Sequence, residues 1–344
     1  MVGDSAWEVD VRRCRIPLPF WSQQHPLSAA AQHCTQDWAH RHGLIRSDHA
    51  LSKFEALGYG RLTSYACSTA TPEHLQLMVD WNTLFFVFDD LQGNALTAGR
   101  PEAYERLRRL ARQTIEEHGG RVVDHPALHA LSDLCRRTFP GRSPAWTARF
   151  ELNLEIWLTG HARENAFRLA GVTPTPDEYI WLRRDASTVY PNCDLIELTE
   201  CVEVPDALYF CGRYRELAAA TADIMCWIND IHSLPAEAVT GDPMNLIVVL
   251  RKQHHLSMGE ALRDVAAMIS ARVGEYQAAA HALTADMDTL KLPAEVQDGV
   301  RRCVRDQGSW AAGMELWDRT DTIRHAVSEL SGVDRLPSYA EKLL

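Results

Sequence analysis

Three oxygen-bearing side chains recur every four residues in the second half of the chain, at Asn229, Ser233 and Glu237. On a helix, this spacing places all three along one face. They offer an amide oxygen, a hydroxyl oxygen and a carboxylate, and a hard cation such as Mg²⁺ prefers oxygen ligands of these kinds. The pattern therefore predicts one side of a divalent-cation site. Taken alone, it is more typical of a solvated helix face.

A second acidic site lies far upstream, where Asp89 and Asp90 directly follow an aromatic and apolar run at 85–88. Two carboxylates at the end of a buried stripe cost desolvation free energy unless a cation compensates their charge. This pair therefore predicts the other side of the cation site. The alternative is that the helix ends in solvent here, with Gly93 and Asn94 forming its C-terminal turn.

The elements that must position these residues are predicted to be helices, because apolar residues recur at intervals of three and four and few segments alternate. The helix that carries Asp89 is predicted to begin after Thr71, which is followed by Pro72 and Glu73. Further helical patterns cover 101–118, 144–168, 177–200, 208–234, 256–283 and 294–330. No linker or repeat divides the chain, so we predict one all-α domain over residues 1–344, a helical bundle around a central apolar cavity.

Composition limits the class of protein. The chain has 344 residues, of which 46% are hydrophobic, and its formal net charge of −11 argues against a nucleic-acid partner. No run approaches the roughly 18 apolar residues that a membrane-spanning helix needs, and the first residues show no signal-peptide pattern. The cysteines are scattered without a CxxC pair, so they are predicted to be reduced. We expect a cytoplasmic protein without a membrane span.

Taken together, the two sites resemble the signatures of class I terpene synthases, the bacterial terpene cyclase family. Asp89 and Asp90 match the start of the aspartate-rich motif DDxxD or DDxxxD/E, and residues 229–237 carry the complete NDxxSxxxE motif. The resemblance implies an all-helical fold and three bound Mg²⁺ ions. The metal-binding residues that it implies are Asp89, Asp90, Asn94, Asn229, Ser233 and Glu237.

The resemblance extends to residues with expected catalytic roles. Arg183 lies 46 residues before Asn229, where the family carries an arginine that senses diphosphate. Ala186 and Ser187 occupy the positions of its linker and effector residues, which lie at a break in a helix. The break would bring Ala186 to the substrate and the Ser187 carbonyl to the first cation.

The C-terminal Arg-Tyr pair of the family corresponds here to Arg324 and His325. Arg324 is expected to contact diphosphate, and Asp90 is expected to orient Arg324 or a metal-bound water. His325 replaces the tyrosine and keeps a hydrogen-bond donor.

Four aromatic side chains are predicted to form the substrate-binding pocket, Phe85, Phe86, Trp310 and Trp317, because aromatic faces stabilise cationic centres. Trp310, Trp317 and Arg324 are spaced by seven residues, so they are expected to share one helical face. That face would join the apolar wall to the diphosphate contact.

Some positions depart from the family pattern. The third acid of the first motif is replaced by Gly93 or Asn94, of which only Asn94 keeps an oxygen donor. Ala236 stands where the family often has a lysine just before the final Glu, so one cationic contact to diphosphate is missing. Pro235 lies inside the second motif and removes one helix hydrogen bond.

The implied activity is Mg²⁺-dependent ionisation of a linear isoprenoid diphosphate, most often farnesyl diphosphate. The resulting cation would be cyclised to a sesquiterpene hydrocarbon or alcohol. The enzyme is expected to be a monomer or homodimer. Geranylgeranyl diphosphate, and hence a diterpene product, is the alternative substrate. A trans-prenyltransferase is disfavoured, because that family has two aspartate-rich motifs and here the downstream motif is Asn/Ser/Glu. A non-catalytic helical scaffold or binding protein derived from a cyclase is the alternative of another class.

Overall fold

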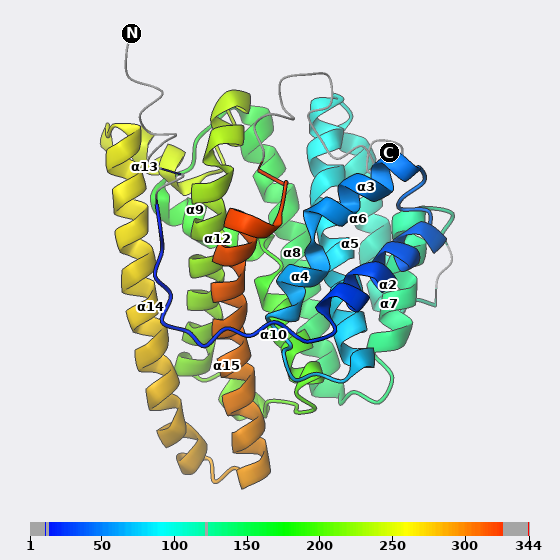
Figure 1. The fold of residues 1–344 in the computed structure, drawn as a ribbon, viewed down its shortest axis with the longest axis vertical. Coiled ribbons are helices and arrows are strands. Elements are labelled where there is room, and N and C mark those ends of the chain that lie inside the picture. Colours follow the sequence, from blue (N-terminus) through cyan, green and yellow to red (C-terminus); the bar gives the residue numbers. More distant parts are fainter. Residues whose placement is uncertain (1–10, 12–13, 121–122, 326–342, 344) are drawn as a thin grey trace.

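The fold is helical throughout the part of the chain that the structure describes (Figure 1). The computed structural model describes residues 11, 14–120, 123–325 and 343, and every regular element within them is a helix. The predicted all-α class is confirmed. No helix in these ranges is long and apolar enough to cross a membrane.

Helix α5 (Pro72–Thr97) carries the first acidic site and begins where the sequence predicts. Thr71 caps it by accepting a hydrogen bond from the His74 backbone N–H at 3.3 Å, and Pro72 takes the first helical position, where its missing N–H costs nothing. The helix continues through Gly93 and Asn94 to Thr97. The alternative of a C-terminal turn at Gly93 is therefore wrong.

The remaining elements agree with most of the predicted segments and add short helices that periodicity did not reveal. They are α2 (Ser28–Arg41), α3 (Asp48–Leu57), α4 (Tyr59–Ser64), α6 (Pro101–Glu116), α7 (Pro126–Thr138), α8 (Pro144–Ala170), α9 (Pro176–Ala186), α10 (Val189–Thr199), α11 (Asp206–Tyr209), α12 (Gly212–Thr240), α13 (Leu246–His254), α14 (Met258–Thr289), α15 (Ala294–Leu316) and the π-helical turn η1 (Trp317–Asp321). Helices α12, α14 and α15 pack together in one half of the molecule, whereas α2 to α7 form the other half (Figure 1).

The segment 177–200 is two helices rather than one, and the break falls at Ser187 and Thr188. Ser187 is extended, with φ −74° and ψ 157°. Pro191 explains the break, because it has no N–H to donate to the Ser187 carbonyl four residues earlier. The Ser187 carbonyl is therefore released from the helical pattern.

The C-terminal helix also ends earlier than predicted. α15 stops at Leu316, η1 follows, and Thr322 is extended. Arg61 donates a hydrogen bond to the Asp321 carbonyl at 3.0 Å, which satisfies a terminal carbonyl of this helix end. The expectation that Arg324 shares a helical face with the two tryptophans is wrong, and residues 326–330 of the predicted helix lie outside the described residues.

One glycine sets the distance between α8 and α9, the helix that leads into the break. A Cβ at Gly160 would lie 2.5 Å from the Ala186 nitrogen and 2.6 Å from the Asp185 carbonyl carbon. Because backbone atoms cannot move aside as a flexible side chain can, α9 packs this closely only against a residue without a side chain. Gly160 therefore positions Ala186 and Ser187.

We expect Gly160→Ala to lower the free energy of unfolding by about 1–3 kcal/mol, because the added methyl group must push α8 and α9 apart. Gly274→Ala is the matched control, since no atom lies within 4 Å of a Cβ at that helical position. It should stabilise the protein by about 0.4–1 kcal/mol. Urea unfolding of both variants checks the pair, and equal effects would contradict the close-packing argument.

Candidate active site

Two sites that are far apart in the sequence face one polar cavity. Helix α5 contributes the aspartates, α12 contributes the second motif, α9 contributes an arginine, and the segment after η1 contributes the last two residues. The predicted site residues that line the cavity are Asp89, Asp90, Arg183, Asn229, Ser233, Glu237, Arg324 and His325. The fold thus brings most of the predicted residues together.

Arg324 holds the first acidic pair. Its Nη2 lies 2.6 Å from Asp89 Oδ2 and 3.1 Å from Asp90 Oδ1. Its Nη1 donates to the Tyr59 hydroxyl at 2.9 Å, and its guanidinium lies 5.0 Å from the centre of the Phe86 ring. Burial by itself would raise the pKa of the Asp89 carboxyl, but the Arg324 charge helps to bring this pKa below its usual value. Asp89 is therefore charged at neutral pH.

Arg183 holds the beginning of the second motif. Its Nη2 donates to Asn229 Oδ1 at 3.0 Å, and its Nε lies 3.6 Å from Asp230 Oδ1. On the other side of Asn229, His325 Nε2 lies 3.4 Å from the amide nitrogen and 2.8 Å from Asp318 Oδ1. The shorter contact favours an Nε2–H that donates to Asp318. Asn229 therefore lies between Arg183 and His325.

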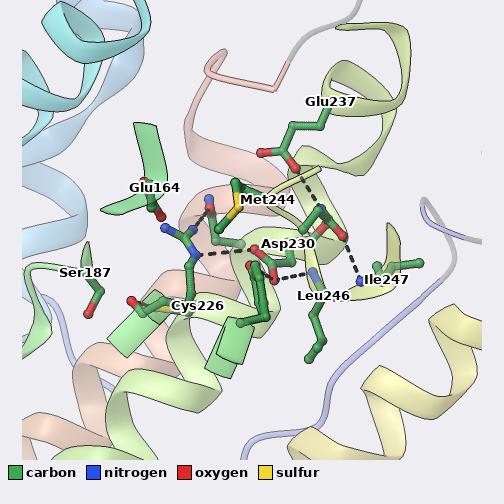
Figure 2. A network of polar contacts seen from close by, with 12 residues as sticks. Glu164, Ser187, Cys226, Asp230, Glu237, Met244, Leu246 and Ile247 are labelled. Atoms are coloured by element: carbon green, nitrogen blue, oxygen red, sulfur yellow. Dashed lines mark hydrogen bonds and ion pairs between the residues drawn. The ribbon is translucent and has the colours of Figure 1, made fainter. Parts of the chain in front are cut away.

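Asp230 points away from the cavity, although it is adjacent to Asn229 in the sequence. It is fully buried and accepts hydrogen bonds from the Tyr179 hydroxyl at 2.6 Å and the Leu246 N–H at 3.0 Å. Burial raises the pKa of this carboxyl, and its contacts with Arg183 and the two donors counteract that effect. Figure 2 shows Asp230 in the middle of this network, between α12 and the start of α13. Its role is to join α9, α12 and α13.

The last two residues of the second motif differ in their partners. Asn245 donates from Nδ2 to Glu237 Oε2 and to the Asp230 carbonyl, both at 2.7 Å. Burial and the carboxylates of Asp230 and Asp242 raise the pKa of Glu237 to about 8. Ser233 Oγ is buried and has no hydrogen-bond partner among the described residues.

These observations fit a hard divalent cation. Such an ion would relieve the repulsion around Glu237 and would give Ser233 Oγ a partner. Within the described ranges, no three His, Cys, Asp or Glu side chains gather at one point that could hold a metal. The oxygens of Asn229 and Ser233 would therefore have to complete the ligand set on α12.

An apolar chamber adjoins the polar cavity. The predicted residues among those that line it are Phe85, Phe86, Asp89, Arg183, Ala186, Ser187, Asn229, Trp310 and Arg324. Four of them, Asp89, Arg183, Asn229 and Arg324, also line the polar cavity, so the two spaces meet at these side chains. The arrangement suits a molecule with an anionic head and an apolar tail.

Two predicted residues lie elsewhere. Trp317 is fully buried, is absent from the chamber wall, and donates from Nε1 to the Leu57 carbonyl at 2.8 Å while packing behind Phe86. It supports the wall rather than forming it. Asn94 does not line the polar cavity, whereas Gly93 and Thr97 do. The structure therefore gives no support to Asn94 as a metal ligand, because its helical direction differs from theirs.

The chamber wall includes two further residues that the sequence patterns did not predict. Trp157 and His161 line it, and Trp157 Nε1 donates to His161 Nε2 at 3.0 Å. His161 Nδ1 then carries the proton and donates to the Tyr104 hydroxyl. Burial lowers the pKa of His161, which keeps the ring neutral. The spacing of four between Trp157 and His161 on a predicted helix was the only available sequence signal.

Comparison with known proteins supports this geometry. A family described as "Terpene synthase family 2, C-terminal metal binding" matches residues 80–275. Pristinol synthase of Streptomyces pristinaespiralis is 28% identical over 337 residues, which cover 95% of this chain and 89% of that protein. The (+)-T-muurolol synthase of Roseiflexus castenholzii, described as "(2E,6E)-farnesyl diphosphate cyclizing", is 32% identical over 256 residues, 73% of this chain and 76% of that one. The crystal structure of an α-eudesmol synthase superposes on this chain with a TM-score of 0.82 and 24% sequence identity. The matched part is 89% of this chain and 99% of that chain, which shows a shared fold.

The hydrogen bond from Tyr179 to Asp230 can be tested for its contribution to stability. We expect Tyr179→Phe to lower the free energy of unfolding by about 1–3 kcal/mol, because a buried carboxylate loses a hydrogen-bond donor. Tyr190→Phe is the control, since its hydroxyl makes no hydrogen bond within the described part of the chain and its loss should change stability by less than about 0.5 kcal/mol. Denaturant unfolding compares them, and a Tyr179→Phe variant as stable as the control would refute the assigned role.

Proposed function

Because the chain belongs to terpene synthase family 2 and is thus a class I terpene synthase, a lyase that acts on diphosphates, we propose that it cyclises farnesyl diphosphate in a Mg²⁺-dependent reaction. The product would be a sesquiterpene hydrocarbon or alcohol, released together with inorganic diphosphate. The single observation that carries the proposal is the junction of the polar cavity with the apolar chamber, at Asp89, Arg183, Asn229 and Arg324.

The choice of substrate rests on the relatives. The muurolol synthase is described as acting on farnesyl diphosphate, and among the other relatives are an epi-isozizaene synthase and pentalenene synthases. Farnesyl diphosphate is therefore the proposed substrate, with geranylgeranyl diphosphate as the alternative. The hypothesis of a non-catalytic scaffold is set aside, because the family is one of enzymes.

The oxygen donors would hold divalent cations, for which we propose three Mg²⁺ ions. Asp89 and Asp90 would bind on the α5 side, whereas Asn229, Ser233 and Glu237 would bind on the α12 side. When bound, the ions supply positive charge that stabilises the departing diphosphate. The match to a family with C-terminal metal binding supports a divalent metal, and the three ions are a proposal.

Arg183 and Arg324 stand at the junction of the two spaces and would bind diphosphate oxygens there. As the allylic carbon–oxygen bond breaks, negative charge grows on the diphosphate, and fixed guanidinium groups stabilise that charge. Each arginine is already oriented by a partner, Arg183 by Asn229 and Arg324 by Tyr59. Metal binding at Asn229 and Asp89 would release the Nη2 atoms of both arginines, which contact these two residues here, to the diphosphate.

The chamber would direct the carbocation. Phe85, Phe86 and Trp310 present aromatic groups to the space where the apolar chain folds, and their faces attract positive charge. The Ser187 carbonyl, freed from the helix by the break before Pro191, would be a further dipole in the chamber wall. The apolar side chains of the wall would disfavour the water that otherwise quenches the cation.

We expect Asp89→Ala and Asn229→Ala each to reduce turnover of farnesyl diphosphate by roughly 100-fold or more while the helical circular dichroism is retained, because diphosphate stabilisation is lost. Asp264→Ala, at an exposed position on α14, is the control and should retain full activity. Volatile products and released diphosphate would be measured with C10, C15 and C20 diphosphates, with and without Mg²⁺. Wild-type turnover in either site variant would contradict the metal assignment, and conversion of the C20 substrate alone would correct the chain length.

A further inference from the structure

A third arginine lines the polar cavity, and no part of the reaction described so far uses it. Arg168 lies in the last turn of α8, and its side chain is 25% exposed. It shares the cavity wall with Arg183 and Arg324. The proposed occupant of this cavity is an anion, which a partly exposed guanidinium could bind. Whether Arg168 can do so depends on which of its N–H donors are free.

Two carboxylates fix the orientation of Arg168. Its Nε lies 3.2 and 3.1 Å from the two oxygens of Asp242, and its Nη1 donates to Glu164 Oε2 at 3.1 Å. Asp242 is itself oriented, because it accepts a hydrogen bond from the Met244 N–H at 2.9 Å. The guanidinium is therefore held in place before any ligand arrives, which reduces the entropic cost of binding.

One nitrogen of this guanidinium has no protein partner. An arginine carries five N–H donors, and Nη2 of Arg168 makes no hydrogen bond to any described residue. Nη2 is also not among the buried polar atoms that lack a partner, so it is open to solvent or ligand. Because Arg168 belongs to the cavity wall and its Nε and Nη1 are already paired, Nη2 is the nitrogen left to bind an occupant of the cavity.

The cavity wall carries more carboxylates than arginines, so an anion bound there needs every cation that the wall offers. The wall carries five carboxylates and three arginines, and Ala236 on α12 adds no charge. The carboxylates are Asp89, Asp90, Glu164, Glu237 and Asp242. Figure 2 shows Glu164, the partner of Arg168, beside the network around Asp230. Arg168 on α8 thus supplies a positive charge that could bind an anion in this cavity, whereas α12 has no cation at position 236.

We propose that Arg168 is a substrate-binding residue that donates hydrogen bonds from Nη2 to the diphosphate group, in place of a cation at position 236. This inference rests on the proposed function, since it assumes that a diphosphate occupies the polar cavity. The competing role is structural, in which Arg168 only ties α8 to the loop after α12 through Asp242.

The test measures binding of inorganic diphosphate in the presence of Mg²⁺ by calorimetry. Arg168→Gln removes the charge but keeps an amide that can donate to Glu164, and we expect it to raise the Kd by roughly 10- to 100-fold. Arg163→Gln is the matched control on the same helix, because Arg163 is 61% exposed, pairs with Asp185 and is absent from the cavity wall. Its Kd should remain within about twofold of wild type. An unchanged Kd in Arg168→Gln would overturn the proposal.

A second substitution separates binding from support. Adding Ala236→Lys to Arg168→Gln returns a cation to the same cavity without restoring the tie to Asp242, so the Kd should recover at least tenfold if charge at the diphosphate is what was lost. An equal loss with and without the lysine would assign Arg168 a structural role. If Arg168→Gln does not fold, Arg168→Met decides, because it keeps the apolar stem of the side chain and removes the charge and every donor. A wild-type Kd in that folded variant would overturn the proposal.

The two proposals fail separately. Turnover of farnesyl diphosphate by the wild-type protein tests the proposed function, whereas the ratio of Kd values for inorganic diphosphate tests Arg168. A wild-type protein that converts no prenyl diphosphate, but whose diphosphate affinity still depends on Arg168, would refute only the function. Normal cyclisation with a diphosphate affinity that is independent of Arg168 would refute only the inference.

Discussion

Carboxylates that meet inside an apolar helical bundle repel one another, and much of the site's construction follows from this repulsion. Buried negative charge is tolerated only beside cations or hydrogen-bond donors. Arg324 meets the pair on α5, whereas Arg183, Tyr179 and Asn245 meet the groups around α12. Burial and the nearby carboxylates of Asp230 and Asp242 raise the pKa of Glu237, the direction expected where negative charge outweighs positive charge. The same shortage of positive charge prepares the cavity for metal ions together with a diphosphate.

Neighbouring residues of one motif have opposite tasks because a helix turns each successive side chain by a constant angle. Asn229 faces the cavity and Asp230 faces the bundle, where it joins α9 and α13. This rotation explains how one motif can present oxygen donors to the cavity and, through Asp230, also hold its helix against α9 and α13. It also explains why substitution of Asp230 would disturb the site without removing a ligand.

The apolar half of the site depends on breaks in the helices rather than on regular structure. Gly160 lets α9 approach α8, and Pro191 explains the break between α9 and α10, so Ala186 and Ser187 enter the chamber wall. Trp157 is oriented by His161, which burial keeps neutral. A charged imidazole in the wall would oppose a carbocation, so a neutral ring is the state compatible with the proposed chemistry.

The sequence by itself determined the helical class and the start of α5, and it pointed to most of the polar residues that line the cavity, because these depend on the spacing of neighbouring residues along one helix. Only the tertiary structure decided how distant segments meet. It brings Arg324 to Asp89 across 235 residues of sequence, although Arg324 lies beyond the point where the observed helix ends. It also moves Trp317 behind the wall and places Arg168 in the polar cavity. Such contacts depend on packing between elements, for which the local pattern of one chain carries no signal.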